Sequence, residues 1–283
     1  MYQLRRPAEA LRPYVEHYWF VTSTVAEPVD LRVDVFVDAR ADLIFNFGAP
    51  YARTVIGGER RTIGASNLDA QRLEPIRIEQ RGLVRTTGVR FQLGGLAPFS
   101  TVALREVTGR TPPPEQVLGP HVRTLEVRLE GEHDPDAQAA ALDAFFLEAL
   151  ARAPSLEGFS RALACAVEAH GGASVEDMAS AAGVSSRHLD RLFARHLGVP
   201  PKTLGTVLRF QRALTSLMRE PEGTLADVAA SAGYFDQAHF IKDFKRMTGG
   251  VPRGYRGYYP PEGPNDFAPN VVVFLQDAER GPV

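Results

Sequence analysis

The chain has 283 residues, of which 44% are hydrophobic, and this is enough for two domains with ordinary buried cores. Its formal net charge of −2 gives no sign by itself of a nucleic-acid-binding protein. The single cysteine, Cys165, excludes an intramolecular disulfide framework and a cysteine metal cluster. We find no basic-apolar leader and no apolar run of about 18 residues, so we expect a soluble cytoplasmic protein without a membrane segment.

The charge is distributed unevenly along the chain. Residues 155–258 carry 13 Lys and Arg against 10 Asp and Glu, a net charge of +3, whereas residues 1–154 have a net charge of −2 and residues 259–283 one of −3. All three lysines (Lys202, Lys242 and Lys245) lie in the basic region. Because a net charge of +3 is modest, any non-specific attraction of this region to a polyanion should be weak and easily screened by salt.

The first 154 residues begin with an irregular arm over 1–12 and continue with short β-type segments separated by Gly, Pro, Asn and Asp. Gly57-Gly58 is expected to form a hairpin turn between two of them. Short strands at this spacing predict a small β-barrel or sandwich. The expected strands are Tyr14–Thr22, Leu31–Val37, Asp42–Phe47, Thr54–Ile56, Arg61–Ile63, Ile76–Ile78 and Leu83–Gln92.

After Gly94-Gly95 the hydrophobic period becomes that of helices. We expect helices over Pro98–Thr108, Glu115–Leu129 and Asp136–Arg152. The last of these carries one apolar stripe, and two interpretations are open: it packs on the β domain of its own chain, or it forms a homodimer interface. Because proline disfavours helix at the residue before it, Ala153-Pro154 is the best boundary for the first domain.

One helical pattern occurs twice between Ser174 and Arg256. The first copy runs from Ser174 to Gly198 and the second from Thr224 to Gly250. The turn glycines of the two copies are 50 residues apart, whereas their inner aromatic positions are 51 apart. The second copy therefore has one extra residue between the glycine and the inner aromatic residue. A duplicated helical pair within one chain predicts a paired DNA reader.

Each copy has the signals of two short helices joined by a tight turn. A hydroxyl residue followed three positions later by an acid begins the first helix, Ser174 with Asp177 and Thr224 with Asp227. The turn glycine suits the left-handed residue that ends this helix. The second helix then begins within about three residues.

The second helix of each copy has an apolar inner face and an outer face of residue types that contact base edges and phosphates. The alternative is a pair of ordinary helical hairpins with solvated charged faces, but the duplication of both glycines and both basic faces argues against it. The outer faces are Ser186, Arg187, Asp190, Arg191 and Arg195 in the first copy, and Gln237, His239, Lys242, Lys245 and Arg246 in the second.

Between the copies, Pro201–Arg219 is expected to be a single helix. At about 1.5 Å per residue this helix is roughly 28 Å long. It therefore places the two outer faces about one DNA turn apart, near ~34 Å, so that both can enter successive major grooves.

These motifs resemble the DNA-binding domain of the AraC/XylS family of bacterial transcription regulators, over roughly residues 156–256. The resemblance rests on GVSSRHL after the first helix, RFQRAL in the linking helix, DVAASAGYFDQAHF in the second copy and VPRGYR at its end. It implies promoter DNA as a partner, and RNA polymerase as a further one. It also implies phosphate contacts from Ser185 or Ser186, and base contacts from Arg187, Asp190, Arg191, Gln237, His239 and Lys242.

The first half resembles the cupin-like sensor domain that many AraC/XylS regulators carry, through PYVEHYWFV, ADLIFNF and GVRFQLGG. The candidates for binding a small-molecule effector are Trp19, Asp42, Phe45 and Arg90. Each of them also suits a structural role, in the core or in an ion pair. No histidines stand at metal-ligand spacing, and no cofactor motif occurs, so we expect neither a metal nor a cofactor.

Residues 259–283 form an extension in which Val271–Gln276 predicts one more strand. An isolated strand is not stable alone, so we expect it to add to the front β domain.

The sequence thus predicts an α+β chain of two domains, with a β-barrel or cupin-like domain and trailing helices over 1–154 and an all-α tandem helix-turn-helix domain over 155–258. We expect a ligand-responsive transcription regulator and not an enzyme. Two alternatives are open. A DNA-repair methyltransferase would need an activated cysteine, whereas Cys165 lies on an apolar helical stripe. An effector-independent structural module would show no salt-dependent affinity for DNA.

Overall fold

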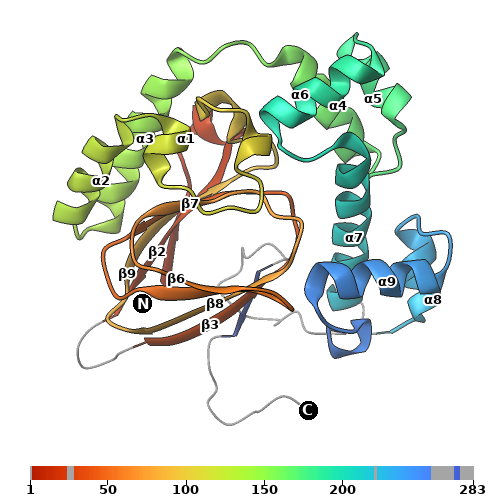
Figure 1. The fold of residues 1–283 in the computed structure, drawn as a ribbon, viewed down its shortest axis with the longest axis horizontal. Helices are drawn as coiled ribbons and strands as arrows, with labels where there is room; N and C mark the ends of the chain where they lie inside the picture. Colours follow the sequence, from red (N-terminus) through yellow and green to blue (C-terminus); the bar gives the residue numbers. More distant parts are fainter. Residues whose placement is uncertain (1, 24–28, 220–221, 256–270, 275–283) are drawn as a thin grey trace.

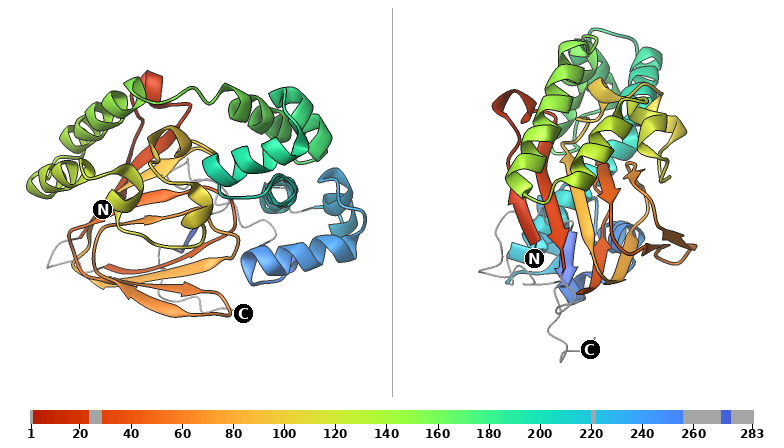
Figure 2. Two further views of the ribbon diagram at one scale, coloured as in Figure 1. Left: turned by 45° about the horizontal axis from the view of Figure 1, so that its top comes forward. Right: turned by 90° about the vertical axis from the view of Figure 1, so that its left-hand side faces the viewer.

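The computed structural model describes residues 2–23, 29–219, 222–255 and 271–274. A sheet-rich N-terminal part is followed by a helical C-terminal part, so the predicted α+β class with two parts is confirmed. The described strands form two sheets and not the closed barrel that was one of the predicted forms. The helical part stands beside the sheets, with helix α7 (Pro201–Arg219) running along their side (Figure 1). Figure 2 shows the same arrangement from two further sides. Among the described residues, no helix is long and apolar enough to span a membrane.

The N-terminal part contains two five-stranded antiparallel sheets. The first has the order β1 (Tyr2–Arg5), β2 (Val15–Thr22), β9 (Arg85–Phe91), β4 (Asp42–Asn46) and β7 (Asn67–Asp69). The second has the order β10 (Val271–Phe274), β3 (Val29–Val35), β8 (Ile76–Gly82), β5 (Tyr51–Val55) and β6 (Arg60–Ile63). The C-terminal strand thus joins the front domain beside β3, as predicted, while the rest of the extension lies outside the described residues.

The strands predicted between Tyr14 and Gln92 are all present, with ends that differ by a few residues. Strands β1 and β7 have no counterpart in the prediction, because β1 lies in the expected irregular arm and β7 is too short to show a period. The predicted helix over Pro98–Thr108 is wrong. This segment forms two 3-10 turns, η2 (Ala97–Phe99) and η3 (Leu104–Glu106), and Ser100 between them is extended, with a ψ of 130°.

Three helices cover one face of the first sheet: α1 (Pro114–Leu118), α2 (Val122–Gly131) and α3 (Pro135–Ala151). The alternation along the strands places Tyr18, Leu43 and Phe91 on this face, fully buried. Leu142 and Phe146 of α3 are equally buried against them. The apolar stripe predicted for Asp136–Arg152 therefore packs on the domain of its own chain.

In the described residues of the C-terminal part there are six α-helices: α4 (Glu157–Glu168), α5 (Val175–Ala182), α6 (Ser186–His196), α7, α8 (Leu225–Ser231) and α9 (Gln237–Thr248). Both α5 and α8 begin with a capping box. The Ser174 hydroxyl accepts from the Asp177 N–H at 3.0 Å, and the Thr224 hydroxyl accepts from the Asp227 N–H at 3.1 Å. Gly183 ends α5 in the left-handed region, with a φ of 70°.

The apolar core of the helical part extends into the sheet domain. Within the helices, Phe210 of α7 packs against Phe244 of α9, with ring centroids 5.8 Å apart. The loop after β3 contributes Phe36, Val37 and Ala39 to the same core, each with at most 1% of its surface exposed. The two parts of the chain therefore share buried apolar surface, whose burial stabilises their contact.

The capping boxes give a direct test of how the two copies are built. We expect Ser174→Ala and Thr224→Ala each to lower the free energy of unfolding by about 1 kcal/mol, because each leaves an N–H of the first helical turn without its acceptor. Ser180→Ala in the exposed interior of α5 is the matched control and should not destabilise, since alanine favours helix. Urea unfolding measures all three. Equal effects at Ser174 and Ser180 would contradict the capping role.

Candidate nucleic-acid interface

The second helix of the first copy, α6, carries an exposed polar face over an apolar inner one. Ser185 is its N-cap and accepts from the His188 N–H at 3.3 Å. Leu189 and Phe193 are fully buried. The predicted base-contacting residues Arg187, Asp190 and Arg191 are all exposed, and Ser186 is half-buried.

The second helix of the second copy, α9, has the same design. Asp236 is its N-cap and accepts from the His239 N–H at 2.7 Å. Phe240 and Phe244 form the buried inner face. The predicted DNA-contacting residues of this copy are exposed: Gln237, His239, Lys242 and Arg246.

Asp243 of α9 is a member of this face that the sequence analysis does not single out. It is 6% exposed, and one of its carboxylate oxygens accepts from Arg246 Nη2 at 2.8 Å. Its other oxygen lies 3.6 Å from His239 Nε2. The spacing is a usable signal, because residues three and four apart are neighbours on a helix. Asp243 therefore holds the Arg246 side chain by a hydrogen bond and lies beside the His239 ring.

The polar faces of α6 and α9 belong to helices at opposite ends of α7 (Figure 1). Apart from Ser186, the predicted DNA-contacting side chains of these helices are exposed with the sheet domain in place. The sheet domain therefore does not cover the predicted DNA-contacting residues.

The sheet domain touches both copies at equivalent places, just beyond the C-terminal ends of α6 and α9. Gly198 and Gly249 have φ angles of 75° and 78°, which favour glycine. Thr108 Oγ1 of the sheet domain donates to the Gly198 carbonyl at 2.9 Å. A Cβ atom on Gly249 would lie 2.5 Å from Cγ2 of Ile56. Each of the two recognition helices, α6 and α9, is therefore followed within two residues by a glycine that is in contact with the sheet domain.

Val37, in the loop between β3 and β4, joins the sheet domain to two helices through its peptide groups. Its N–H donates to the Met247 carbonyl of α9 at 3.3 Å. Its carbonyl accepts from Gln211 Nε2 of α7 at 2.5 Å. The neighbouring Phe36 ring packs edge-on against Tyr255, at 5.3 Å between centroids.

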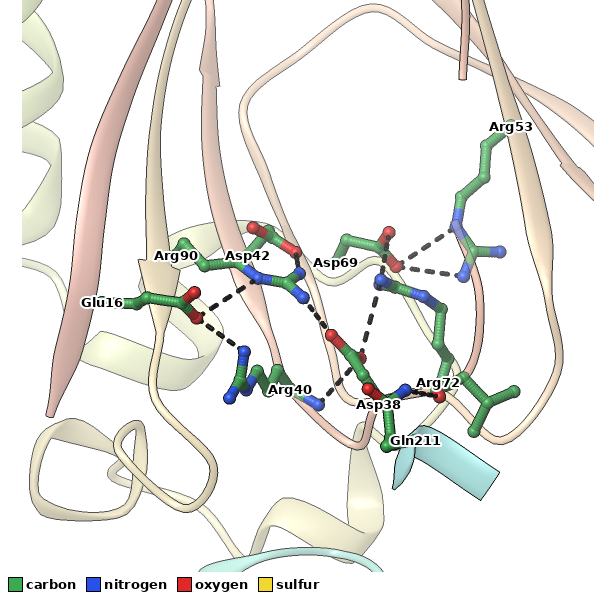
Figure 3. Close-up of polar contacts among 10 residues, drawn as sticks. Glu16, Asp38, Arg40, Asp42, Arg53, Asp69, Arg72, Arg90 and Gln211 are labelled. Atoms are coloured by element: carbon green, nitrogen blue, oxygen red, sulfur yellow. Dashed lines mark hydrogen bonds and ion pairs between the residues drawn. The ribbon is translucent and has the colours of Figure 1, made fainter. Parts of the chain in front are cut away.

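Asp38, next to Val37, anchors this loop in a buried network of ion pairs (Figure 3). Asp38 is 5% exposed and accepts from Arg90 of β9, which also donates to Asp42 at 2.5 Å. Arg72 Nη2 lies 3.8 Å from Asp38, and the Arg40 N–H donates to it at 3.1 Å. The position of Val37 is therefore set by charged groups of the sheet domain.

The network continues across the two sheets with balanced charge. Arg72 and Arg53 both pair with Asp69, at 3.2 and 3.0 Å, and Arg40 pairs with Glu16 at 2.7 Å. Four carboxylates thus face four guanidinium groups: Glu16, Asp38, Asp42 and Asp69 with Arg40, Arg53, Arg72 and Arg90. The balance matters because an uncompensated buried charge is strongly destabilising.

The structure brings together three of the four candidate effector-binding residues. Asp42 and Arg90 are paired across β4 and β9, and Trp19 lies over Gly88 on the same face of the first sheet. Phe45 is on the opposite face, fully buried among the residues under α1–α3. Asp42 and Arg90 form an ion pair with each other, which is the structural role that the sequence allowed for both. Among the described residues, no group of three His, Cys, Asp or Glu side chains is placed to hold a metal ion.

Burial and charge act in opposite directions on Asp38. Burial alone raises the pKa of this carboxyl group, but the positive charges of Arg90, Arg72 and Arg40 outweigh it and lower the pKa below its ordinary value. Asp38 is therefore more acidic in the folded chain than in the unfolded chain.

Two family models match the chain. A helix-turn-helix domain matches residues 178–258, and a domain of unknown function (DUF6597) matches residues 3–113. Among curated relatives, the HTH-type transcriptional regulator GlxA of Rhizobium meliloti is 37% identical over 79 residues, which are 28% of this chain and 24% of that protein. The uncharacterized HTH-type transcriptional regulator YidL of Escherichia coli is 38% identical over 79 residues, or 28% and 26%. The chain thus spans about a quarter of the length of these relatives.

Among solved structures, ToxT from Vibrio cholerae covers 81% of this chain and 97% of its own, with a TM-score of 0.44 and 11% identity. An AraC-type regulator from Chromobacterium violaceum covers 37% of this chain and 95% of its own, with a TM-score of 0.35 and 25% identity.

Residues 178–258 are therefore a helix-turn-helix domain. Its type is that of the AraC regulators, so the resemblance predicted from the duplicated motif is confirmed for this part of the chain.

Replacing Asp38 tests whether the buried network stabilises the fold. We expect Asp38→Asn to cost about 3–5 kcal/mol at pH 7, because it leaves the four guanidinium groups of the network facing only three carboxylates, so that one positive charge is uncompensated. Since the folded-state pKa of Asp38 is lowered, its contribution is complete above the ordinary aspartate value of about 3.9 and is lost as the pH falls through the folded-state pKa.

The measurement is the difference in urea unfolding free energy between wild type and variant over a pH series. The matched control is Asp30→Asn on β3, the strand that precedes the Asp38 loop, where an exposed pair with Arg81 should contribute less than about 1 kcal/mol. A difference between wild type and Asp38→Asn that stayed constant down to pH 2 would contradict the assignment.

Proposed function

We propose that this protein is a sequence-specific DNA-binding transcription regulator in which α6 and α9 enter two successive major grooves. The observation that carries the proposal is that both polar faces stay exposed at the two ends of α7 while the sheet domain is docked. A recognition helix needs such a free face, because its N-terminal residues contact base edges and neighbouring residues contact phosphates.

The length of α7 supports simultaneous entry into both grooves. Its 19 residues correspond to about 28 Å of helix, close to the ~34 Å of one DNA turn. The two faces differ in chemistry, since Arg187, Asp190 and Arg191 are on one and Gln237, His239 and Lys242 on the other. A single chain therefore reads an asymmetric site with two different half-sites.

The contacts of the sheet domain support a role in control. It touches the chain just beyond α6 at Gly198, and it touches α9 at Met247. An effector that binds the sheet domain better in one arrangement than in another would change the positions available to the two helices. Residues 1–154 would then form the sensor domain and residues 155–258 the reader. A homodimer through α3 would have to use its exposed side, which includes Leu147, because Leu142 and Phe146 are buried.

Substitutions on the two exposed faces test the proposal. On a site selected from random duplex DNA, we expect Arg191→Ala and Lys242→Ala each to weaken binding by about 1–3 kcal/mol and to relax discrimination at the bases they contact. Arg105→Ala, on the exposed surface of the sheet domain, is the charge-matched control and should change little.

The measurement is the dissociation constant at fixed salt, on the selected site and on random DNA. An equal loss on both kinds of DNA would assign the two residues to phosphate contacts only. Unchanged affinity in both variants would exclude these faces as the DNA-binding surface.

A further inference from the structure

Phe235, in the turn between α8 and α9, is almost completely exposed to solvent. Its relative exposure is 93%, the highest among the exposed large hydrophobic residues of the described chain. The preceding residue, Tyr234, is 6% exposed and packs on Phe240 at 5.4 Å between ring centroids. The core is thus complete without Phe235, and packing does not explain an aromatic residue at this position.

The second copy has one more residue than the first between the turn glycine and the N-cap of its second helix, and Phe235 is this extra residue. The Val184 N–H donates to the Ala179 carbonyl at 3.0 Å, and the Tyr234 N–H makes the equivalent bond to the Ala229 carbonyl at 2.9 Å. Val184 is followed directly by the N-cap of α6, whereas Phe235 stands between Tyr234 and the N-cap of α9. The inserted residue therefore lies at the N-terminal end of one recognition helix only.

The surroundings of Phe235 are those of the predicted base-contacting face. Residues 235–239 are all exposed, and they include Gln237 and His239. Among the described residues of α8, α9 and the turn between them, Phe235 is the sole exposed large hydrophobic residue. A protein partner would favour an apolar patch around an aromatic anchor. A lone aromatic ring among polar groups fits a DNA groove better.

We propose that Phe235 is a specificity-determining residue, whose ring contacts the 5-methyl group of a thymine in the major groove entered by α9. The thymine methyl is the apolar feature of that groove, and phenylalanine is among the side chains suited to contact it. The contact would exist in the second half-site alone, because the first copy lacks the inserted residue. The inference rests on the proposed function, since it requires α9 to enter a major groove.

The test removes the ring and the methyl group separately. The full-length wild-type chain first selects its site from random duplex DNA. Each thymine of that site is then replaced in turn by deoxyuridine, which lacks only the methyl group. Dissociation constants are measured for wild type, Phe235→Ala and Leu83→Ala, the last being a matched loss of an exposed apolar side chain in the sheet domain.

We expect Phe235→Ala to weaken binding to the selected site about tenfold, which corresponds to about 1.4 kcal/mol, while Leu83→Ala leaves it unchanged. At one thymine of the second half-site, deoxyuridine should weaken the wild type several-fold and leave Phe235→Ala unaffected. Because the ring lies outside the core, the unfolding temperature of Phe235→Ala should equal that of the wild type.

Two results would overturn the proposal. Wild-type affinity of Phe235→Ala for the selected site would show that the ring makes no contact with DNA, and equal deoxyuridine effects in both proteins would show that the contact is not to a methyl group. If the wild type selected no sequence at all, the proposed function itself would fail, and the inference with it.

Discussion

The sheet domain contacts the glycine that follows each recognition helix, Gly198 after α6 and Gly249 after α9. The arrangement of the two recognition helices depends on this pair of contacts. Gly198 and Gly249 occupy equivalent positions in the two copies, and both have left-handed φ angles. At Gly198, a side chain would overlap Gln71 and Thr108, and at Gly249 it would approach Ile56. Since the same domain meets both ends, the distance between α6 and α9 is set by the sheet domain as well as by α7.

The buried ion pairs explain how the sheet domain can position a short loop so closely. Ala39 has a φ of 56°, which is strained for a residue with a side chain, at a cost of order 1–3 kcal/mol. The pairs of Asp38 with Arg90 and Arg72 fix the loop on the sheet side, and the hydrogen bonds of Val37 with Met247 and Gln211 fix it on the helix side. A change among the charged groups would therefore be transmitted to α9 through two adjacent residues.

The sequence predicts the helical domain far better than the sheet domain, for physical reasons. Capping residues, turn glycines and a period of 3.6 are local signals, and the duplication repeats each of them, so α5 to α9 are recognisable. Two spacings in the sequence indicate which side chains lie together, but they are easy to overlook. Asp243 stands four residues after His239, and Asp42 and Phe45 are three residues apart on one strand, which puts them on opposite faces. The partners of Asp38 and the contacts of Gly198 depend on residues far away in the sequence, and no local pattern indicates them.

If the sheet domain holds the two helix-turn-helix units at a fixed separation, the distance between the units should take a single value. A direct measurement is the distribution of distances between spin labels at Ser180 and Ser231, exposed and outside the predicted DNA-contacting faces, in a Cys165→Ser background. A fixed separation predicts one narrow distribution, which broadens when Thr108→Ala removes the hydrogen bond to Gly198 and Gln211→Ala removes the hydrogen bond between α7 and Val37. A broad distribution in the chain with both contacts intact, or one that the two substitutions leave unchanged, would contradict it.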